Sequence, residues 1–283
     1  MHGRFSRSPG TGYPVGMADV LHDPADEAVL AAIDLNWRAS ARAYGLAPTT
    51  TLRDDDELFW YVTGLPSGAF NSIMYANLPA PARIDAAVAE LQALRQRHGV
   101  PVGWLIGPSS RPTDLGRQLE ARGLEHRIDL TPMTRTLDAL PAAAPVPGLT
   151  IERVEDPAAY EAWIVAEQRG FEAATHDETG LADLRRAMGI GHGFPLHHLL
   201  GRLDGAPVAT ATLLPAAGIG GIYDVSTVPE ARRRGIGMAM TLAALREARR
   251  LGYEIVFLQP STMGRPLYER IGFQQRCVCP TYG

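Results

Sequence analysis

One stretch of the chain combines glycine and arginine in a pattern suited to holding an anion. It reads Val228-Pro-Glu-Ala-Arg-Arg-Arg-Gly235-Ile-Gly237-Met-Ala and lies between a predicted strand and a predicted helix. The first N–H groups of a helix have no partner inside the helix, and the helix dipole adds about half a positive charge there. The two glycines remove Cβ atoms where an anion would press against the backbone, and the three arginines add attraction. The pattern favours a phosphate or diphosphate site.

Other phosphate-binding loops fit these residues less well. A dinucleotide fingerprint needs a third glycine at the position of Met240. A Walker loop needs Gly-Lys, and all 27 basic residues of the chain are arginine. On spacing alone, a solvated run of arginines before a glycine-broken helix start stays open as the plainer alternative.

The elements that must position this loop follow from hydrophobic periodicity and turn signals. Asp156 is a good N-cap before Pro157, and Asp204-Gly205 is a two-residue hairpin turn. The predicted strands cover 149–153, 196–203, 207–214, 221–228 and 255–258, with a last one from Phe273, and the predicted helices cover 157–169, 181–188, 235–251 and 266–270. The order βααβββαβαβ predicts an α/β fold with a mixed, mostly antiparallel sheet.

The length of 283 residues favours two compact units. Residues 141–148, Pro-Ala-Ala-Ala-Pro-Val-Pro-Gly, suit neither helix nor strand and indicate a linker. We therefore expect a flexible extension at 1–16, a first domain at 17–140 and a second domain at 149–283. Met17 is a candidate for the natural start.

The first domain repeats part of the second. Leu78-Pro79, then a long helix from about Arg83, parallels Val228-Pro229 and its helix, and Leu119-Glu-Ala-Arg-Gly-Leu parallels Tyr268-Glu-Arg-Ile-Gly-Phe. Two repeats in the same order predict a duplicated fold.

Together, the loop and the downstream segment resemble a known family. Arg232-x-x-Gly235-x-Gly237-x-Ala239, followed by Leu267-Tyr268-x-x-x-Gly272-Phe273, is similar to the motifs of the GNAT superfamily of acyl-CoA-dependent N-acyltransferases. The resemblance covers roughly residues 149–282, and the first domain resembles a degenerate copy. It implies two tandem GNAT-like domains and acetyl-CoA as the cosubstrate.

The resemblance also implies roles for individual residues. The strand that lies beside the pantetheine arm and polarises the thioester is matched by Val225, Ser226, Thr227 and Val228. The diphosphate loop is matched by Arg232, Arg233, Arg234, Gly235, Ile236, Gly237, Met238 and Ala239. Gln259 and Ser261 fall where the family often contacts pantetheine, although the asparagine frequently found there is absent. Tyr268 matches the tyrosine that protonates the leaving thiolate.

An amine acceptor also needs a group that takes its proton. A lysine-like amine with a pKa of about 10 is only about one part in a thousand neutral at pH 7, a deficit of roughly 4 kcal/mol. Asp224, just before the thioester strand, is the leading candidate base, and its alternatives are a polar strand residue or an anchor for the substrate ammonium. Strand alternation predicts that Tyr223 faces the other way. Glu167, Phe171 and Glu172, near the end of the preceding helix, are weaker candidates for the substrate site, as is Tyr223.

The first domain is expected to have lost this chemistry. Asp85 would place its own negative charge at the helix opening that corresponds to Gly235 and Gly237, and Leu119 stands where Tyr268 stands. We expect this domain to complete the acceptor pocket or to cover the sheet.

Composition excludes several other classes of function. A formal charge of −4 and a pI near 6.1 argue against a nucleic-acid partner. No apolar run approaches the roughly 20 residues that span a bilayer, and the first residues lack a secretory signal, so we expect a cytoplasmic protein. No metal is expected, because His197 and His198 are adjacent in a strand and point to opposite faces.

The sequence therefore predicts an N-acetyltransferase that moves an acetyl group from acetyl-CoA to a primary amine of a small molecule. Direct attack is expected, because Cys277 and Cys279 both lie away from the motif. Two alternatives stay open: a protein that binds or senses acyl-CoA without turnover, and an acyl-CoA decarboxylase on the same fold. A monomer or a homodimer is expected.

Overall fold

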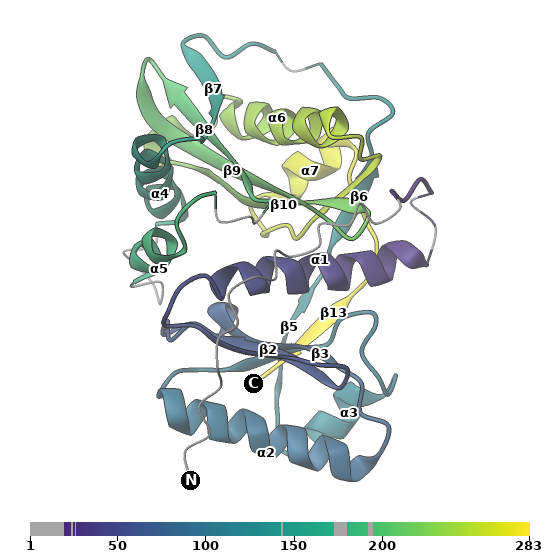
Figure 1. Cartoon of the computed structure of the whole chain (residues 1–283). Helices are drawn as coiled ribbons and strands as arrows, with labels where there is room; N and C mark the ends of the chain where they lie inside the picture. Colours follow the sequence, from purple (N-terminus) through teal and green to yellow (C-terminus); the bar gives the residue numbers. More distant parts are fainter. Residues whose placement is uncertain (1–19, 24, 26, 143, 173–179, 192–194) are drawn as a thin grey trace.

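The computed structural model describes residues 20–23, 25, 27–142, 144–172, 180–191 and 195–283, so the predicted extension at 1–16 and Met17 lie outside the described residues. Five layers follow one another in Figure 1: the helices α6 and α7, a sheet, a central layer that contains α1, a second sheet, and the helices α2 and α3. The fold is the mixed α/β arrangement that the sequence predicts, with two mixed sheets.

In the described residues, the first half of the chain contains three α-helices and six strands. They are α1 (Ala28–Tyr44), β1 (Thr51–Asp54), β2 (Leu58–Val62), β3 (Asn71–Ala76), α2 (Pro81–His98), β4 (Gly103–Leu105), α3 (Leu115–Glu120), β5 (His126–Leu130) and β6 (Met133–Thr136). A short 3-10 turn, η1 (Gly68–Phe70), precedes β3.

The second half begins with a strand and closes with three short elements. It contains β7 (Leu149–Arg153), α4 (Pro157–Phe171), α5 (Leu181–Met188), β8 (His197–Leu203), β9 (Ala206–Ala216), β10 (Ile219–Thr227), α6 (Ile236–Arg250), β11 (Ile255–Leu258), α7 (Arg265–Ile271), β12 (Gln274–Gln275) and β13 (Cys279–Tyr282). These elements match the predicted ones closely: the Asp156 carboxylate caps α4 by accepting from the Ala159 N–H at 2.8 Å.

The two sheets exchange one strand each. The first sheet has the order β1-β2-β3-β4-β13-β5, and the second has the order β12-β6-β11-β10-β9-β8-β7. In each sheet the exchanged strand pairs antiparallel with the second member of a parallel pair, so β13 lies beside β4 and β6 beside β11. This repeated arrangement is the structural form of the predicted duplication.

Because of this exchange, neither sheet is formed by one predicted domain alone. Residues 17–140 contribute β6 to the second sheet, and residues 149–283 return β13 to the first sheet, so the linker at 141–148 does not separate the two sheets. The single last strand predicted from Phe273 was therefore wrong: it is two strands, β12 and β13, which belong to different sheets. Pairing between segments so distant in sequence leaves no local signal.

Helix α1 lies between the sheets and joins them. Asn36, fully buried, donates to the main-chain oxygens of Leu214, Ala216 and Ile219 at 3.0–3.3 Å. Its side-chain oxygen accepts from the Tyr223 hydroxyl at 2.8 Å. Because the Asn36 side chain of α1 hydrogen-bonds four polar groups of the second half, α1 fixes the position of β10. None of the helices in the described part of the chain is long and apolar enough to cross a membrane.

Candidate active site

A bulge interrupts β10 where the sequence places the thioester strand. Tyr223 pairs with Thr212 and Ser226 with Thr210, so β10 carries one residue more than β9 across this step. Asp224 lies within the bulge and has a φ of 51°, a left-handed backbone conformation that is rare for a residue with a side chain. The Thr210 hydroxyl holds the bulge by donating to the Asp224 carbonyl at 2.6 Å and sharing a hydrogen bond with Ser226.

Beyond the bulge, β10 parts from its parallel neighbour. The two strands pair only from Gly220 opposite Val256 to Ile222 opposite Leu258, and β10 continues to Thr227 without this partner. The main-chain groups of residues 225–227 on that side are therefore free of the parallel ladder, which suits contact with a bound amide chain.

Gln259 follows β11 directly at this opening. Its Oε1 atom is buried and has no hydrogen-bond partner among the described residues, while its amide nitrogen donates to the Pro260 carbonyl at 3.2 Å. A buried acceptor without a donor costs free energy, and an amide N–H of a ligand would satisfy it. The Ser261 hydroxyl instead accepts from the Gly264 N–H at 3.1 Å.

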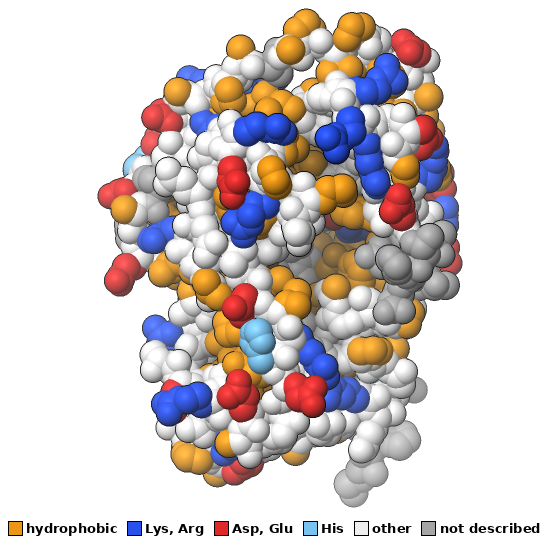
Figure 2. All heavy atoms as spheres, turned by 180° about the vertical axis from the view of Figure 1, so that it is seen from behind, with side chains coloured by type: hydrophobic (Ala, Val, Ile, Leu, Met, Phe, Trp, Pro, Cys, Tyr) orange, Lys and Arg blue, Asp and Glu red, His pale blue; other side chains and the backbone are white. Residues whose placement is uncertain are grey.

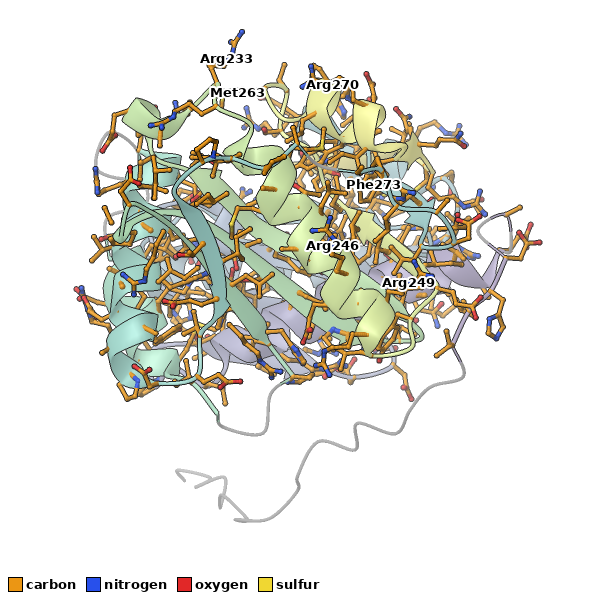
Figure 3. The ribbon with its side chains drawn as sticks, turned by 90° about the horizontal axis from the view of Figure 1, so that it is seen from above. Arg233, Arg246, Arg249, Met263, Arg270 and Phe273 are labelled. Atoms are coloured by element: carbon orange, nitrogen blue, oxygen red, sulfur yellow. The ribbon has the colours of Figure 1, made fainter. Side chains whose placement is uncertain are left out.

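The glycine–arginine loop is a tight turn in front of α6. Arg233 and Gly235 both have left-handed backbones, with φ of 62° and 84°, and α6 begins at Ile236. Arg233 and Arg234 are exposed, and Figure 3 shows Arg233 pointing away from the body of the molecule. The turn thus presents the amides that begin α6 with two cations beside them, which is the geometry an anion requires.

Arg232, which was predicted to help hold the cofactor, has its guanidinium engaged with protein groups. It donates to the carbonyls of Thr227 at 3.0 Å and Gly170 at 2.8 Å, and lies 3.3 Å from a Glu172 carboxylate oxygen. These contacts tie the end of β10 to the end of α4. We therefore assign the Arg232 side chain to holding the loop in position.

Glycine also allows α4 to approach the bulged strand. A Cβ atom added at Gly170 would lie 2.3 Å from the Ser226 hydroxyl and 3.2 Å from the Thr227 nitrogen, which is closer than side chains pack. Phe171, at the end of the helix, is 45% exposed, and Glu172 beyond it faces Arg232. The structure therefore separates these two predicted substrate residues from Glu167, which is buried further back along α4.

Tyr268 lies on the α6 and α7 side of the second sheet. Its ring is buried, packs edge-on against Phe273 and is close to Gly264, where an added Cβ would lie 2.9 Å from the ring and 3.2 Å from the Ser261 hydroxyl. Burial raises the pKa of Tyr268 to about 12. The phenol is therefore protonated at neutral pH and able to donate a proton.

Asp224 lies on the other side of the sheet in a buried cluster of charges. Arg185 of α5 donates to its Oδ1 at 2.8 Å and to the two carboxylate oxygens of Glu167 at 2.6 and 3.2 Å. Burial alone would lower the pKa of Arg185, but the carboxylates of Asp224 and Glu167 raise it well above its ordinary value. One guanidinium therefore serves both carboxylates.

Aromatic rings and a histidine enclose this cluster. The Arg185 guanidinium lies 5.4 Å from the ring centre of Trp163 and 5.7 Å from that of Tyr44. His198 packs on Trp163 at 4.4 Å and shares a hydrogen bond with Thr212. Burial, the largest effect, lowers the pKa of His198 to about 4, so its ring is neutral at pH 7.

A small cavity of about 30 Å³ opens at Asp224. Both halves of the chain line it, with Ser40, Ala43, Tyr44, Arg185, Met188, Leu196, Thr212, Tyr223 and Asp224. The prediction that Tyr223 and Asp224 face opposite ways was wrong, because the bulge at Asp224 breaks the alternation of the strand. α1 supplies one wall, so the first half does contribute to this pocket.

Arg185 is the residue that sequence reasoning missed. Within α5 it shares a face with Leu181, Leu184 and Met188, which are buried, and this i, i+3, i+4 spacing marks it as an inward-facing charge. An arginine on an apolar stripe requires a buried acid, and that requirement was the available signal.

Two expectations about the remaining residues have different outcomes. His197 and His198 do face opposite sides, since His197 lies 2.9 Å from Glu247 of α6 and His198 shares a hydrogen bond with Thr212. The argument from Asp85 was wrong in detail, because α2 begins at Pro81, which places Asp85 in the second turn, where it pairs with Arg122.

Comparisons with known proteins agree with this geometry. Residues 158–273 match the model of the Acetyltransferase (GNAT) family. The chain is 30% identical to a mycothiol acetyltransferase of Thermomonospora curvata over 94% of its own length and 95% of the relative, and 33% identical to that of Thermobispora bispora over about half of each chain.

Solved structures share the whole arrangement. A GCN5-related N-acetyltransferase from Kribbella flavida aligns with a TM-score of 0.66 at 19% identity, over 88% of this chain and 95% of that one. A tandem GNAT protein from the clavulanic acid biosynthesis pathway aligns with a TM-score of 0.59 at 14% identity, over 93% and 96%. These likenesses establish the tandem fold. Together with the full-length relative, they show that the chain is an acyltransferase that belongs to the GNAT family.

Proposed function

We propose that this protein transfers an acetyl group from acetyl-CoA to a primary amine of a small molecule. The observation that carries the proposal is the bulge of β10, which turns Asp224 toward the small cavity, next to the segment 225–227 that has left the parallel ladder. Family members use acetyl-CoA, and the buried acceptor of Gln259 and the turn before α6 both fit it.

The carboxylate of Asp224 favours a cationic acceptor. Arg185 shares one guanidinium between Glu167 and Asp224, His198 is neutral, and the cavity beside them is small. An ammonium group would pair with the Asp224 carboxylate at this cavity. Arg185 occupies Oδ1 of Asp224, and Oδ2 has no hydrogen bond within the described chain, so Oδ2 is the oxygen we assign to the amine.

The proposed reaction is a direct attack. Asp224 holds the ammonium and takes its proton, and the amine nitrogen then attacks the thioester carbonyl carbon beside residues 225–227. The carbon–sulfur bond breaks as the new carbon–nitrogen bond forms. Tyr268, whose pKa of about 12 keeps it protonated, gives its proton to the departing thiolate. The nitrogen of the new amide releases its second proton to solvent, and the Tyr268 phenolate regains a proton from solvent.

The relatives suggest where to look for the acceptor. Both matched relatives are mycothiol acetyltransferases, and the chain covers nearly the whole length of one of them. We include the acceptor of those enzymes in the test, together with other primary amines and matched alcohols.

The test is release of free thiol from acetyl-CoA with this panel. Turnover with amines and none with the matched alcohols is the expected result. Saturable binding of acetyl-CoA without thiol release on any acceptor would instead indicate a sensor. Release of carbon dioxide from malonyl-CoA without an amine would indicate a decarboxylase.

A further inference from the structure

A second and much larger cavity lies in the first half of the molecule. Its volume is about 710 Å³, within the range of about 300–1,000 Å³ typical of small-molecule sites. It lies against the first sheet and is lined by α1, β2–β5, β13 and the end of α2, so it shares no lining residue with the cavity at Asp224. Figure 2 shows the surface hollowed at the waist of the molecule, with hydrophobic side chains around the hollow.

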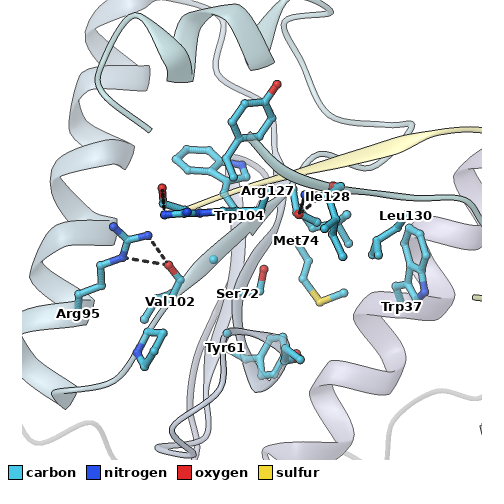
Figure 4. Close-up of a pocket in the computed structure, with 18 residues that line it drawn as sticks. Trp37, Tyr61, Ser72, Met74, Arg95, Val102, Trp104, Arg127, Ile128 and Leu130 are labelled. Atoms are coloured by element: carbon cyan, nitrogen blue, oxygen red, sulfur yellow. Dashed lines mark hydrogen bonds between the residues drawn. The ribbon is translucent and has the colours of Figure 1, made fainter. Parts of the chain in front are cut away.

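The lining is largely apolar and aromatic. Trp37 of α1, Met74 of β3 and Leu130 of β5 face one another across it, with Tyr61 below them in Figure 4. Ile128, also in the lining, is 59% exposed, an unusual exposure for a large aliphatic side chain in a strand. Burying these surfaces would stabilise a bound apolar molecule by about 25 cal/mol for each Å² removed from water.

Two arginines give the cavity a positive end. Arg95 of α2 donates its Nε and Nη2 hydrogens to the Val102 carbonyl at 3.0 and 2.7 Å, and no carboxylate within the described chain lies at ion-pair distance from it. Burial, followed by the charge of Arg127, lowers the pKa of Arg95 below its ordinary value. Arg127 pairs with Glu125 at 3.2 Å in an exposed contact. A half-buried guanidinium with only a carbonyl for a partner retains donors for an anion.

We propose that this cavity binds a small apolar molecule that carries one carboxylate, at a site separate from the acyl-transfer site. The apolar part lies among Trp37, Met74 and Leu130, and the carboxylate lies at Arg95, with Arg127 adding attraction. The inference rests on residues of α1, α2 and the first sheet, and it is independent of the proposed acceptor.

The test is isothermal titration of the full chain with decanoate. Saturable binding of one decanoate per chain is expected, with decyltrimethylammonium, which has the same chain length and the opposite charge, at least about tenfold weaker. Saturation with acetyl-CoA should leave the decanoate affinity unchanged. If acetyl-CoA displaces decanoate, or if decanoate gives no saturable heat, the proposal is overturned.

Three variants locate the site. Arg95→Gln should weaken decanoate binding at least about tenfold, because it removes the charge that the carboxylate needs. Arg97→Gln removes an exposed charge from the same turn of α2 and should change nothing. Ser72→Phe fills the cavity from β3 while leaving Arg95 in place, and should abolish binding in a protein whose thermal midpoint shows it folded. Wild-type affinity in both Arg95→Gln and Ser72→Phe would refute the assignment.

Discussion

Replacing Arg185 by methionine should destabilise the protein far more than the same change at Arg186, its neighbour. Arg185 is 5% exposed and is the cation between Glu167 and Asp224, whereas Arg186 lies at the surface with Glu161 and Asp183. Removing one partner from a buried ion pair costs about 3–5 kcal/mol, because the remaining charge loses its compensation. We expect a loss of that size for Arg185→Met at pH 7.5.

The pH dependence of the loss tests its cause. Without the guanidinium, the carboxylates of Glu167, which is buried, and Asp224, which is partly buried, lose the cation between them, and we expect the folded variant to relieve their repulsion by binding a proton that the unfolded chain does not bind at neutral pH. Folding then takes up a proton, so the free energy of unfolding falls as pH rises, by about 1.4 kcal/mol per pH unit. The variant should therefore be least stable at pH 8 and recover toward pH 6.

Urea unfolding followed by tryptophan fluorescence at pH 6, 7 and 8 measures both effects, since Trp163 packs on the cluster. Arg186→Met is the matched control and should leave the midpoint nearly unchanged, because exposed ion pairs contribute little. Equal losses in the two variants, or an Arg185→Met loss that does not depend on pH, would refute the account of the buried cluster.

Four further changes probe the rest of the site. Asp224→Asn should lower kcat/KM for the amine at least about 100-fold with little change in acetyl-CoA affinity, since it removes the carboxylate that holds the ammonium and takes its proton, and a wild-type value would remove Asp224 from the reaction. Tyr268→Phe should lower kcat without changing acetyl-CoA affinity; because the acid must be protonated and its pKa is about 12, wild-type kcat should show no loss from this residue below about pH 10. Gly237→Asp puts a carboxylate in the first turn of α6 and should weaken acetyl-CoA binding at least about tenfold by calorimetry, so an unchanged Kd would contradict the diphosphate loop. Asn36→Leu leaves buried carbonyls and the Tyr223 hydroxyl without their partner and should cost about 2 kcal/mol or more in urea unfolding.

The parts of the site that could be predicted are those with a local cause. The turn before α6 follows from Gly235, and the start of α4 follows from Asp156 and Pro157, because each residue acts on its own backbone. The second-half helices and strands before Phe273 followed from hydrophobic periodicity. Their observed ends differ from the expected ones by a few residues at most.

The parts that could not be predicted depend on partners distant in sequence. The bulge at Asp224 is held by Thr210 on another strand, so alternation along β10 gave the wrong direction for Tyr223. Helix α1 forms a wall of the acceptor cavity through contacts nearly 190 residues away, including Asn36 with Tyr223. Arg185 had a signal in its helical position, but its two acids could be identified only once α4, α5 and β10 were placed together.

Because β6 and β13 are exchanged between the two sheets, the first sheet can be completed only late in synthesis of the chain. β13 pairs with β4 through Thr281 and Leu105, so the first sheet keeps a gap beside β4 until residues 279–282 have been synthesised. An amino-terminal fragment released early would present bare strand edges, which are sites of aggregation. Neither half can therefore be cut out as a minimal catalyst: a gene cleaved at the linker would yield two pieces, each carrying a strand that the other lacks.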